Sequence, residues 1–262
     1  MRPVATFLFL LLAIAVVPAR AAHTDVQLLL SADTARPGDT VLAGVQLKME
    51  PGWHTYWKNP GDAGQATEIK WTLPPGVTAG EIQWPLPKKL PPAEVTTYGY
   101  EDEVVLLVPL TLASNLPAGA LDLAAKVSWL ECKESCIPAS ADVTGKINIG
   151  SETKISADAA TIEAWRKQTP NPANNLGKIN TITNLDIYYV SWDEEINANL
   201  RKLLIQIQGA RTNLVDFFPD AAENFEIQPE VTSSYNEWAN VTVIQKSVKK
   251  FSGAWPKEIS GV

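Results

Sequence analysis

The sequence has few of the residues from which most catalytic centres are built. It holds two cysteines, two histidines and two methionines in 262 residues, and two cysteines with two scattered histidines do not make a zinc site. It has no Gly-x-Ser-x-Gly segment and no Gly-x-x-x-x-Gly-Lys segment after a predicted strand, which mark serine hydrolases and phosphate-binding loops. The sequence therefore gives no reason to expect a hydrolase or a nucleotide-binding enzyme.

Long apolar runs are also scarce, and the one that occurs stands at the start of the chain. Residues Phe7 to Val17 are apolar, Arg2 precedes them, and Ala19-Arg20-Ala21 fits an A-x-A cleavage site. The run is too short to span a bilayer comfortably. We predict that residues 1–21 are a secretory signal peptide and that the mature chain is periplasmic. No later run approaches transmembrane length, so we expect no stable membrane insertion.

Positive charge is in short supply as well. Because Arg2 and Arg20 leave with the signal peptide, 20 basic residues remain against 29 acidic ones, a formal net charge of −9 instead of −7. An acidic surface repels nucleic acid and anionic membranes. We therefore expect neither of them as a partner.

What the sequence has in quantity is the pattern of short β-strands. Nineteen prolines and nine tryptophans accompany short alternating runs, and residues 22–150 contain roughly eight or nine such runs between turn signals like Pro37-Gly38-Asp39-Thr40. This pattern predicts an all-β domain of the immunoglobulin-like β-sandwich class. A barrel would give a similar pattern, and the Cys…Trp…Cys spacing of antibody domains does not occur.

A second, smaller β-domain is expected after the first. Residues 156–168 are rich in helix formers and stop before Thr169-Pro170-Asn171-Pro172, so residues 151–180 are predicted to be a short helix and a linker. Residues 181–262 resume the strand pattern and are assigned to the second domain. Its expected strands include Ile187–Val190, Leu203–Ile207, Phe225–Ile227 and Val241–Ile244.

The two cysteines stand close together, at Cys132 and Cys136. The residues around Val127 and Trp129 are typical of a strand, Lys133-Glu134-Ser135 is a plausible turn, and Ile137 begins a returning strand. Such a hairpin brings the cysteines to the separation that a disulfide needs. A disulfide that closes so short a loop stabilises the folded state by only about 2 kcal/mol. This small gain favours a role in thiol–disulfide exchange over a purely structural role. A disulfide with a purely structural role remains the alternative.

Several blocks of the first domain together resemble a known family, the periplasmic N-terminal region of DsbD-type thiol:disulfide interchange proteins. The resemblance is closest to the ScsB branch, which is associated with copper tolerance. It covers most of residues 22–150, and Phe217–Asp220 and Ile259–Val262 are similar to the next segment of proteins in that branch. The blocks are Gly52–Asp62, Trp71–Val77, Ile82–Pro85, Thr97–Tyr100 and Trp129–Pro138.

The resemblance implies an immunoglobulin-like fold whose hairpin cysteines relay electrons. Cys136 would form the mixed disulfide with a partner and Cys132 would resolve it, by thiolate attack that needs no metal or organic cofactor. The implied activity is that of a protein-disulfide reductase. Implied partners are periplasmic thioredoxin-like or disulfide isomerase proteins, or cytochrome c maturation proteins, with a separate membrane protein as the electron donor.

The chain departs from better-known DsbD members near the cysteines. Those members separate the cysteines by five residues instead of three, and an aromatic side chain on a loop caps the pair. The aligned position here is Thr97, with Tyr98 and Tyr100 beside it. These three residues are therefore candidates for the cap.

A second aromatic stretch offers candidates for partner docking. Trp53, Tyr56 and Trp57 could line a docking surface, or they could pack in the core and at its rim. His54 could act as a base next to the thiols, or it could be an ordinary loop histidine.

The cysteines also allow two other classes of function, metal binding and non-catalytic binding. Reduced thiolates select Cu(I), and Met49 and His54 could join Cys132 and Cys136 as ligands, although the sequence has no Met-rich or His-rich tract. The chain could also be a binding module with a structural disulfide. A thioredoxin-like protein should reduce the disulfide if it relays electrons, whereas a structural disulfide should resist reduction.

Overall fold

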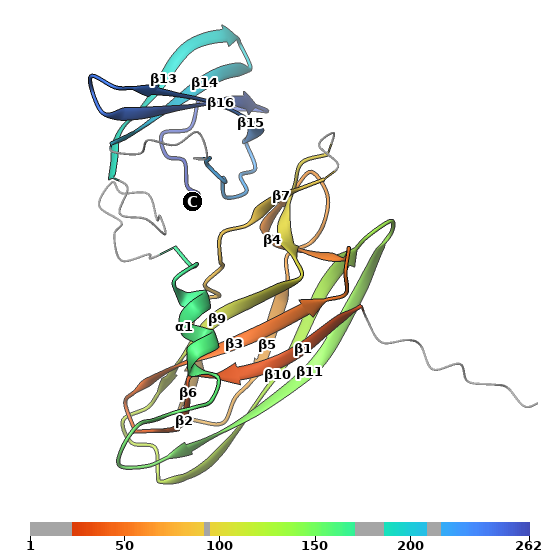
Figure 1. Ribbon diagram of the computed structural model, residues 1–262, viewed down its shortest axis with the longest axis vertical. Helices are drawn as coiled ribbons and strands as arrows, with labels where there is room; N and C mark the ends of the chain where they lie inside the picture. Colours follow the sequence, from red (N-terminus) through yellow and green to blue (C-terminus); the bar gives the residue numbers. More distant parts are fainter. Residues whose placement is uncertain (1–22, 92–94, 171–185, 209–215) are drawn as a thin grey trace, which may run out of the picture.

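A computed structural model describes residues 23–91, 95–170, 186–208 and 216–262. It has an elongated β-sandwich, a helix on the side of the sandwich, and a separate small sheet beyond one end (Figure 1). The predicted signal peptide at residues 1–21 lies outside the described residues. Among the helical segments described, none has the length and apolar character needed to cross a bilayer.

Two sheets form the sandwich, which confirms the predicted all-β, immunoglobulin-like class. In the first sheet the strand order is β1-β3-β9-β6. In the second the order is β12-β2-β11-β10-β4-β8-β7, and β5 pairs with β10. The bounds are β1 Thr24–Leu30, β2 Ala32–Ala35, β3 Thr40–Met49, β4 His54–Gly61, β5 Glu68–Thr72, β6 Val77–Ala79, β7 Lys88–Leu90, β8 Thr97–Glu101, β9 Glu103–Leu112, β10 Gly119–Cys132, β11 Cys136–Ile149 and β12 Lys154–Ile155.

The core lies between the two sheets. In β3 the buried side chains of Val45 and Leu47 alternate with the more exposed Gln46 and Lys48, as expected where one face of a strand packs inward. They meet Leu106 of β9 and, from the second sheet, Val127 and Trp129 of β10. The core therefore reaches almost to the end of the sandwich where the cysteines are found.

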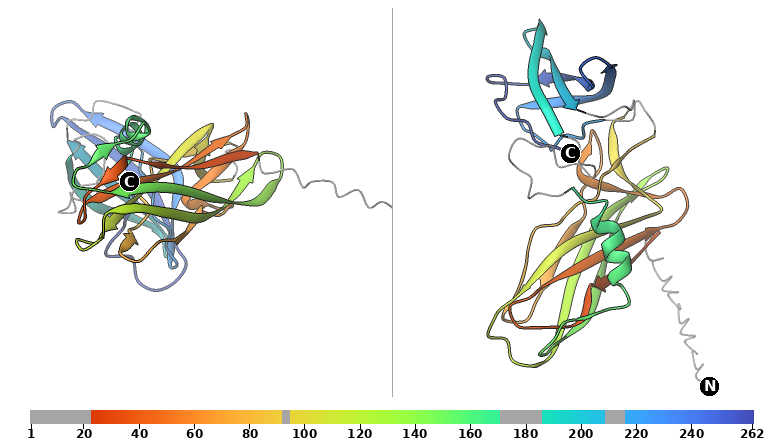
Figure 2. Two further views of the ribbon diagram at one scale, coloured as in Figure 1. Left: turned by 90° about the horizontal axis from the view of Figure 1, so that it is seen from below. Right: turned by 60° about the vertical axis from the view of Figure 1, so that its left-hand side comes forward.

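The helix α1 (Ala159–Arg166) covers the outer face of the first sheet (Figure 2). Its buried Ile162 packs against Leu29, Val105 and Leu107. This cover explains why residues 104–108 of β9 form one continuous buried apolar run, since a strand buried on both faces loses its alternation. The helix falls within the predicted range of residues 156–168.

Four antiparallel strands make the C-terminal sheet, in the order β13-β14-β16-β15. Their bounds are β13 Asp186–Asn197, β14 Leu200–Gln208, β15 Phe225–Asn236 and β16 Val241–Lys250. Leu203, Ile205, Ile244 and Val248 form its core. Each strand contains one of the four strands expected here, and the division into domains at residues 150 and 180 stays a prediction.

A short stretch before β15, residues 216–220, joins this sheet to the sandwich, and we call it the docking segment. The Phe218 ring contacts Tyr98 and Trp57, with ring centroids 5.5 and 6.5 Å away. Asn59 Nδ2 donates a hydrogen bond to the Pro219 carbonyl oxygen over 2.8 Å. Two ion pairs, Lys58–Asp220 and Lys89–Asp216, flank these contacts. Both apolar and charged contacts thus fix the C-terminal sheet against β4, β7 and β8.

Candidate functional site

The β10–β11 hairpin carries the cysteines at its tip. The two strands pair without a break from Gly119 opposite Ile149 to Cys132 opposite Cys136. A disulfide joins Cys132 and Cys136, with 4.2 Å between their Cα atoms. The turn between them is the one that the sequence predicts, and Lys133 N–H donates to the Ser135 carbonyl oxygen over 3.3 Å. The pair therefore sits at the end of a rigid two-stranded ladder.

The two sulfur atoms belong to residues of very different exposure. Cys132 is 3 % exposed and is part of the core, whereas Cys136 is exposed to solvent. The neighbours of Cys136 are exposed as well, including Ile137, at 41 %, and Pro138. A partner that approaches from solvent therefore reaches Cys136 before Cys132.

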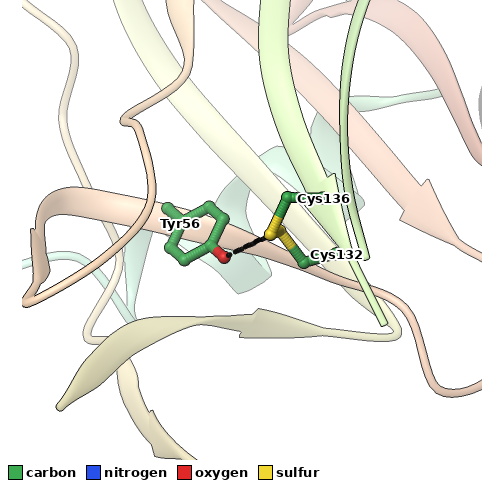
Figure 3. The surroundings of a disulfide bond; sticks show 3 residues. All are labelled: Tyr56, Cys132 and Cys136. Carbon is green, nitrogen blue, oxygen red and sulfur yellow. Dashed lines mark hydrogen bonds between the residues drawn. A yellow bond between two sulfur atoms is a disulfide. The ribbon is translucent and has the colours of Figure 1, made fainter. Parts of the chain in front are cut away.

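Tyr56 of β4 lies over the disulfide (Figure 3). Its hydroxyl donates a hydrogen bond to Cys132 Sγ over 2.8 Å and lies 3.5 Å from Cys136 Sγ. The residue is 3 % exposed, and burial raises the pKa of Tyr56 above its usual 10.0. The hydroxyl therefore keeps its proton at neutral pH and remains a donor to sulfur.

His54 is the neighbour of Cys132 across the β4–β10 ladder. It stands opposite Cys132 on one side and Glu101 on the other, and its ring meets the Tyr56 ring edge-on with centroids 5.3 Å apart. Burial lowers the pKa of His54 below 6.5, and the Glu101 charge opposes part of that shift. The imidazole beside the disulfide is therefore mainly neutral at pH 7.

Glu131 is a buried carboxylate next to Cys132 in sequence, and it is not among the site residues predicted from the sequence. It is 0 % exposed. Its Oε1 accepts a hydrogen bond from His23 N–H over 2.7 Å, and its Oε2 accepts one from Trp129 Nε1 over 3.0 Å. The signal that could have found it is a lone charge at the inner end of an apolar strand, directly before the cysteine.

His23 and Trp53 complete this corner of the sandwich. Their rings stack with centroids 3.9 Å apart, and His23 Nδ1 lies 2.8 Å from Glu50 Oε2. Trp53, a candidate for contact with a partner protein, is half-buried beside the hairpin. The start of the described chain is thereby tied to the cysteine hairpin.

The other candidates lie in the core, and no described contact joins them to the disulfide. Trp57 and Tyr98 are buried against Phe218 of the docking segment. Tyr100 donates to the Pro85 carbonyl oxygen over 2.7 Å, and burial raises the pKa of Tyr100. Thr97 is buried at the start of β8. Of the aromatic candidates, the structure places Tyr56 against the sulfur atoms.

The copper interpretation draws no added support from the residues around the cysteines. Within the ranges that the structure describes, no three His, Cys, Asp or Glu side chains gather as a metal-binding group. Met49 is buried, and Thr55 Oγ1 lies 3.9 Å from its sulfur. The cysteines themselves are joined as a disulfide.

The fold and the site together define a class: an immunoglobulin-like module with a disulfide at a hairpin tip, in which one cysteine is buried and the other is exposed. Residues 26–147 match the family described as thiol:disulfide interchange protein DsbD, N-terminal. This match confirms the resemblance seen in the sequence.

A solved structure extends the likeness beyond the sandwich. The N-terminal periplasmic domain of ScsB from Proteus mirabilis superposes with a TM-score of 0.60 and 19% sequence identity, over 87% of this chain and 82% of that chain. At this identity the match shows a shared fold. No curated protein sequence matches the chain.

Proposed function

We propose that this protein is a periplasmic thiol:disulfide interchange module that passes reducing equivalents through Cys132 and Cys136 to partner proteins. The observation that carries the proposal is the unequal exposure of the two cysteine residues, whose disulfide lies beneath a tyrosine hydroxyl. The match of residues 26–147 to the DsbD N-terminal family supports the same chemistry. The predicted signal peptide supports a periplasmic location.

Reduction of the module begins at Cys136, the exposed cysteine. A donor thiolate attacks Cys136 Sγ, a mixed disulfide forms there, and the bond to Cys132 breaks with its electron pair going to Cys132 Sγ. The Tyr56 hydroxyl already points at that sulfur over 2.8 Å. It stabilises the departing thiolate, because a hydrogen bond to a charged acceptor is stronger than one to a neutral acceptor. The donor's second thiol then releases the donor as its own disulfide.

Transfer to a partner is the reverse sequence with a new disulfide. The Cys136 thiolate attacks a sulfur of the partner's disulfide, which releases one partner thiolate and leaves a mixed disulfide at Cys136. The Cys132 thiolate then attacks Cys136 Sγ, which releases the second partner thiolate and restores the bond seen in the structure. No metal or organic cofactor takes part in these steps.

The partners we propose are thioredoxin-like or disulfide isomerase proteins, with a separate membrane protein as electron donor. Roles in disulfide isomerisation, cytochrome c maturation or copper tolerance are consistent with the family resemblance. Ile137 and Pro138, exposed beside Cys136, and half-buried Trp53 are the surface we assign to docking.

The reduction potential of the Cys132–Cys136 pair tests the proposal. The purified mature protein is equilibrated in graded thiol buffers, and free thiols are trapped and counted. A potential of roughly −180 to −270 mV, in the range of catalytic dithiols, is the expected result. A potential below about −300 mV would show that the disulfide is structural and would overturn the proposal.

A further inference from the structure

The outer edge of β11 has no described strand beside it next to the disulfide. β11 pairs with β10 along its whole length, and on its other side β2 pairs with Asn148 and Ile149. Among the described residues, no strand pairs with that side of β11 between Cys136 and Ile147. Figure 1 shows β11 along the border of the sandwich. An unpaired strand edge presents peptide groups that can pair with another chain.

The register of the β10–β11 hairpin decides which peptide groups point outward, away from β10. Cys132 and Cys136 face each other with 4.2 Å between their Cα atoms, close to the distance of about 4.5 Å at which paired residues turn their peptide groups away from each other. Because this pattern alternates, the peptide groups of Pro138 and Ser140 point outward as well. Gly150, which continues the same series, donates its N–H outward to a carbonyl oxygen of β2 over 3.0 Å. The edge that begins at Cys136 therefore offers outward N–H and C=O groups.

The side chains along this edge suit a short pairing partner. Residues 136–141 carry no charge, and Asp142 is the first charged residue along the strand. Pro138 has no N–H, and within sheets proline occurs where that N–H would face solvent. Its carbonyl oxygen can still accept a hydrogen bond, whereas its ring interrupts the row of donors and so opposes long edge-to-edge pairing between copies of the chain.

A mixed disulfide at Cys136 brings the partner's backbone to the distance of a neighbouring strand. The Cα atoms of two cysteines in a disulfide are about 4.4–6.8 Å apart, and neighbouring strands lie about 4.8 Å apart. A partner whose cysteine is joined to Cys136 therefore has its chain beside β11. Cys136, Pro138 and Ser140 are all exposed, so this edge is open to solvent on the side from which the partner approaches.

We propose that the partner protein presents its reactive cysteine on an extended segment, which joins the second sheet as an added strand along residues 136–140. Cys136 and Ser140 each donate an N–H and accept at a carbonyl oxygen, and Pro138 accepts at its carbonyl oxygen. Pairing through the backbone gives affinity without demanding one side-chain sequence, which suits a module that serves several partners. This inference rests on the proposed redox function and names the form in which the partner is recognised.

Thiol–disulfide exchange with two peptides tests the proposal. The first is a nine-residue peptide of alternating threonine and valine with a central cysteine, and the second is the same peptide methylated at every backbone nitrogen except that of the cysteine, so that it cannot pair as a strand. The mature Cys132→Ser protein starts as a mixed disulfide between Cys136 and N-acetylcysteine amide. The peptide thiolate attacks Cys136 Sγ, and N-acetylcysteine amide leaves as its thiolate. The exchange equilibrium constant should be at least fivefold larger for the unmethylated peptide, and equal constants for the two peptides overturn the proposal.

Matched proline variants in the same Cys132→Ser protein locate the contact. Ser140→Pro removes one outward N–H and should bring the two exchange constants within twofold of each other. Thr144→Pro removes an outward N–H farther along the edge than the peptide reaches, and should keep the fivefold difference. Both variants are first checked for the thermal unfolding of their parent. A folded Ser140→Pro protein that keeps the full difference overturns the proposal.

Hydrogen exchange measured by NMR needs no proline variant. The Ser140 N–H should exchange at least tenfold more slowly when the unmethylated peptide is attached to Cys136 than when N-acetylcysteine amide is attached. An unchanged exchange rate overturns the proposal.

Failure of this inference is distinguishable from failure of the redox function. A reduction potential in the range of catalytic dithiols together with equal exchange constants overturns the strand pairing alone. A reduction potential in the range of structural disulfides overturns the redox function, and the inference that rests on it falls as well.

Discussion

At the disulfide, two sulfur atoms that are bonded to each other have unlike surroundings. Cys132 is enclosed by the core and accepts the Tyr56 hydroxyl bond, whereas Cys136 faces solvent. The difference follows from strand geometry, because Cys132 ends a strand that is paired on both sides while Cys136 begins one that is exposed there. The difference in exposure supports the proposed roles of Cys136 as the attacking thiol and Cys132 as the resolving thiol.

The single-cysteine variants should differ in reactivity accordingly. In the Cys132→Ser variant the thiol of Cys136 remains, and in the Cys136→Ser variant the thiol of Cys132 remains. The Cys136 thiol should react with an aromatic disulfide reagent at least tenfold faster than the Cys132 thiol, because access limits thiol exchange. Stopped-flow absorbance measures both rates. In denaturant the two rates should become similar, and equal rates in the folded proteins would contradict the assigned roles.

Tyr56→Phe should slow reduction of the disulfide by dithiothreitol. The lost hydrogen bond to the departing Cys132 thiolate is worth about 1.5 kcal/mol, which is roughly a tenfold change in rate. The rate is followed by thiol trapping. Tyr235→Phe, on the C-terminal sheet, serves as the control and should reduce at the wild-type rate; an unchanged rate in Tyr56→Phe would remove the hydroxyl from the mechanism.

His54 should make the folded state lose stability as the pH falls. Since burial lowers the pKa of His54 in the folded protein, its neutral form contributes stability above the unfolded pKa of about 6.5, and this stability is lost as pH falls toward the folded pKa. The urea midpoint should therefore drop more between about pH 7.5 and pH 5 in the wild type than in His54→Gln. Parallel curves for the two proteins would show that the pKa of His54 is the same in the folded and unfolded states.

Among the elements, the ones with clear periodicity could be predicted from the sequence. Alternation predicts β3 and β10, and helix formers before a proline predict α1. The described part of residues 22–150 contains eleven strands instead of the expected eight or nine. The additional ones include β2, β6 and β7, which at three or four residues are too short to display a period of two.

The site could be predicted in part. The hairpin and its cysteine pair follow from the spacing, because a three-residue turn fixes which residues face each other. Which aromatic side chain covers the sulfur atoms does not follow, because adjacent residues of β4 point to opposite faces. Tyr56 faces the disulfide while Trp57 faces the docking segment, and only the register of β4 against β10 decides this.

Glu131 connects two elements, the start of β1 and the end of β10. Glu131→Ala should lower the free energy of unfolding by about 2–3 kcal/mol, because the His23 N–H and the Trp129 indole lose their acceptor in a buried place. Urea unfolding followed by tryptophan fluorescence measures the change. Glu134→Ala, in the exposed turn between the cysteines, should change it by less than about 0.5 kcal/mol. Similar values for both variants would show that the Glu131 hydrogen bonds contribute little.

In the whole molecule, one strand serves both the disulfide and the docked C-terminal sheet. β4 presents Tyr56 to the sulfur atoms, and its next residue, Trp57, lies against Phe218. The packing of the C-terminal part thus helps to hold the strand that carries the tyrosine.

Phe218→Ala should weaken this packing. We expect the free energy of unfolding to fall by about 2 kcal/mol, because contacts with two aromatic rings are lost and a void remains. Denaturant unfolding measures the loss. The control is Trp238→Ala, which removes a fully exposed aromatic side chain at the β15–β16 turn and should change stability by less than about 0.5 kcal/mol. Equal effects of the two changes would mean that the docking segment contributes little to the fold.

The unbroken β10–β11 ladder has a consequence for the state of the hairpin after the disulfide opens. Fourteen residue pairs hold the two strands in register, and the sulfur–sulfur bond is only the last link between them. Reduction therefore leaves both thiols on the same scaffold, side by side, where each meets the other at a high effective concentration. In the proposed relay, the resolving step that follows a mixed disulfide at Cys136 is therefore intramolecular and needs no refolding. The local geometry of the hairpin would then set the time for which a partner stays attached.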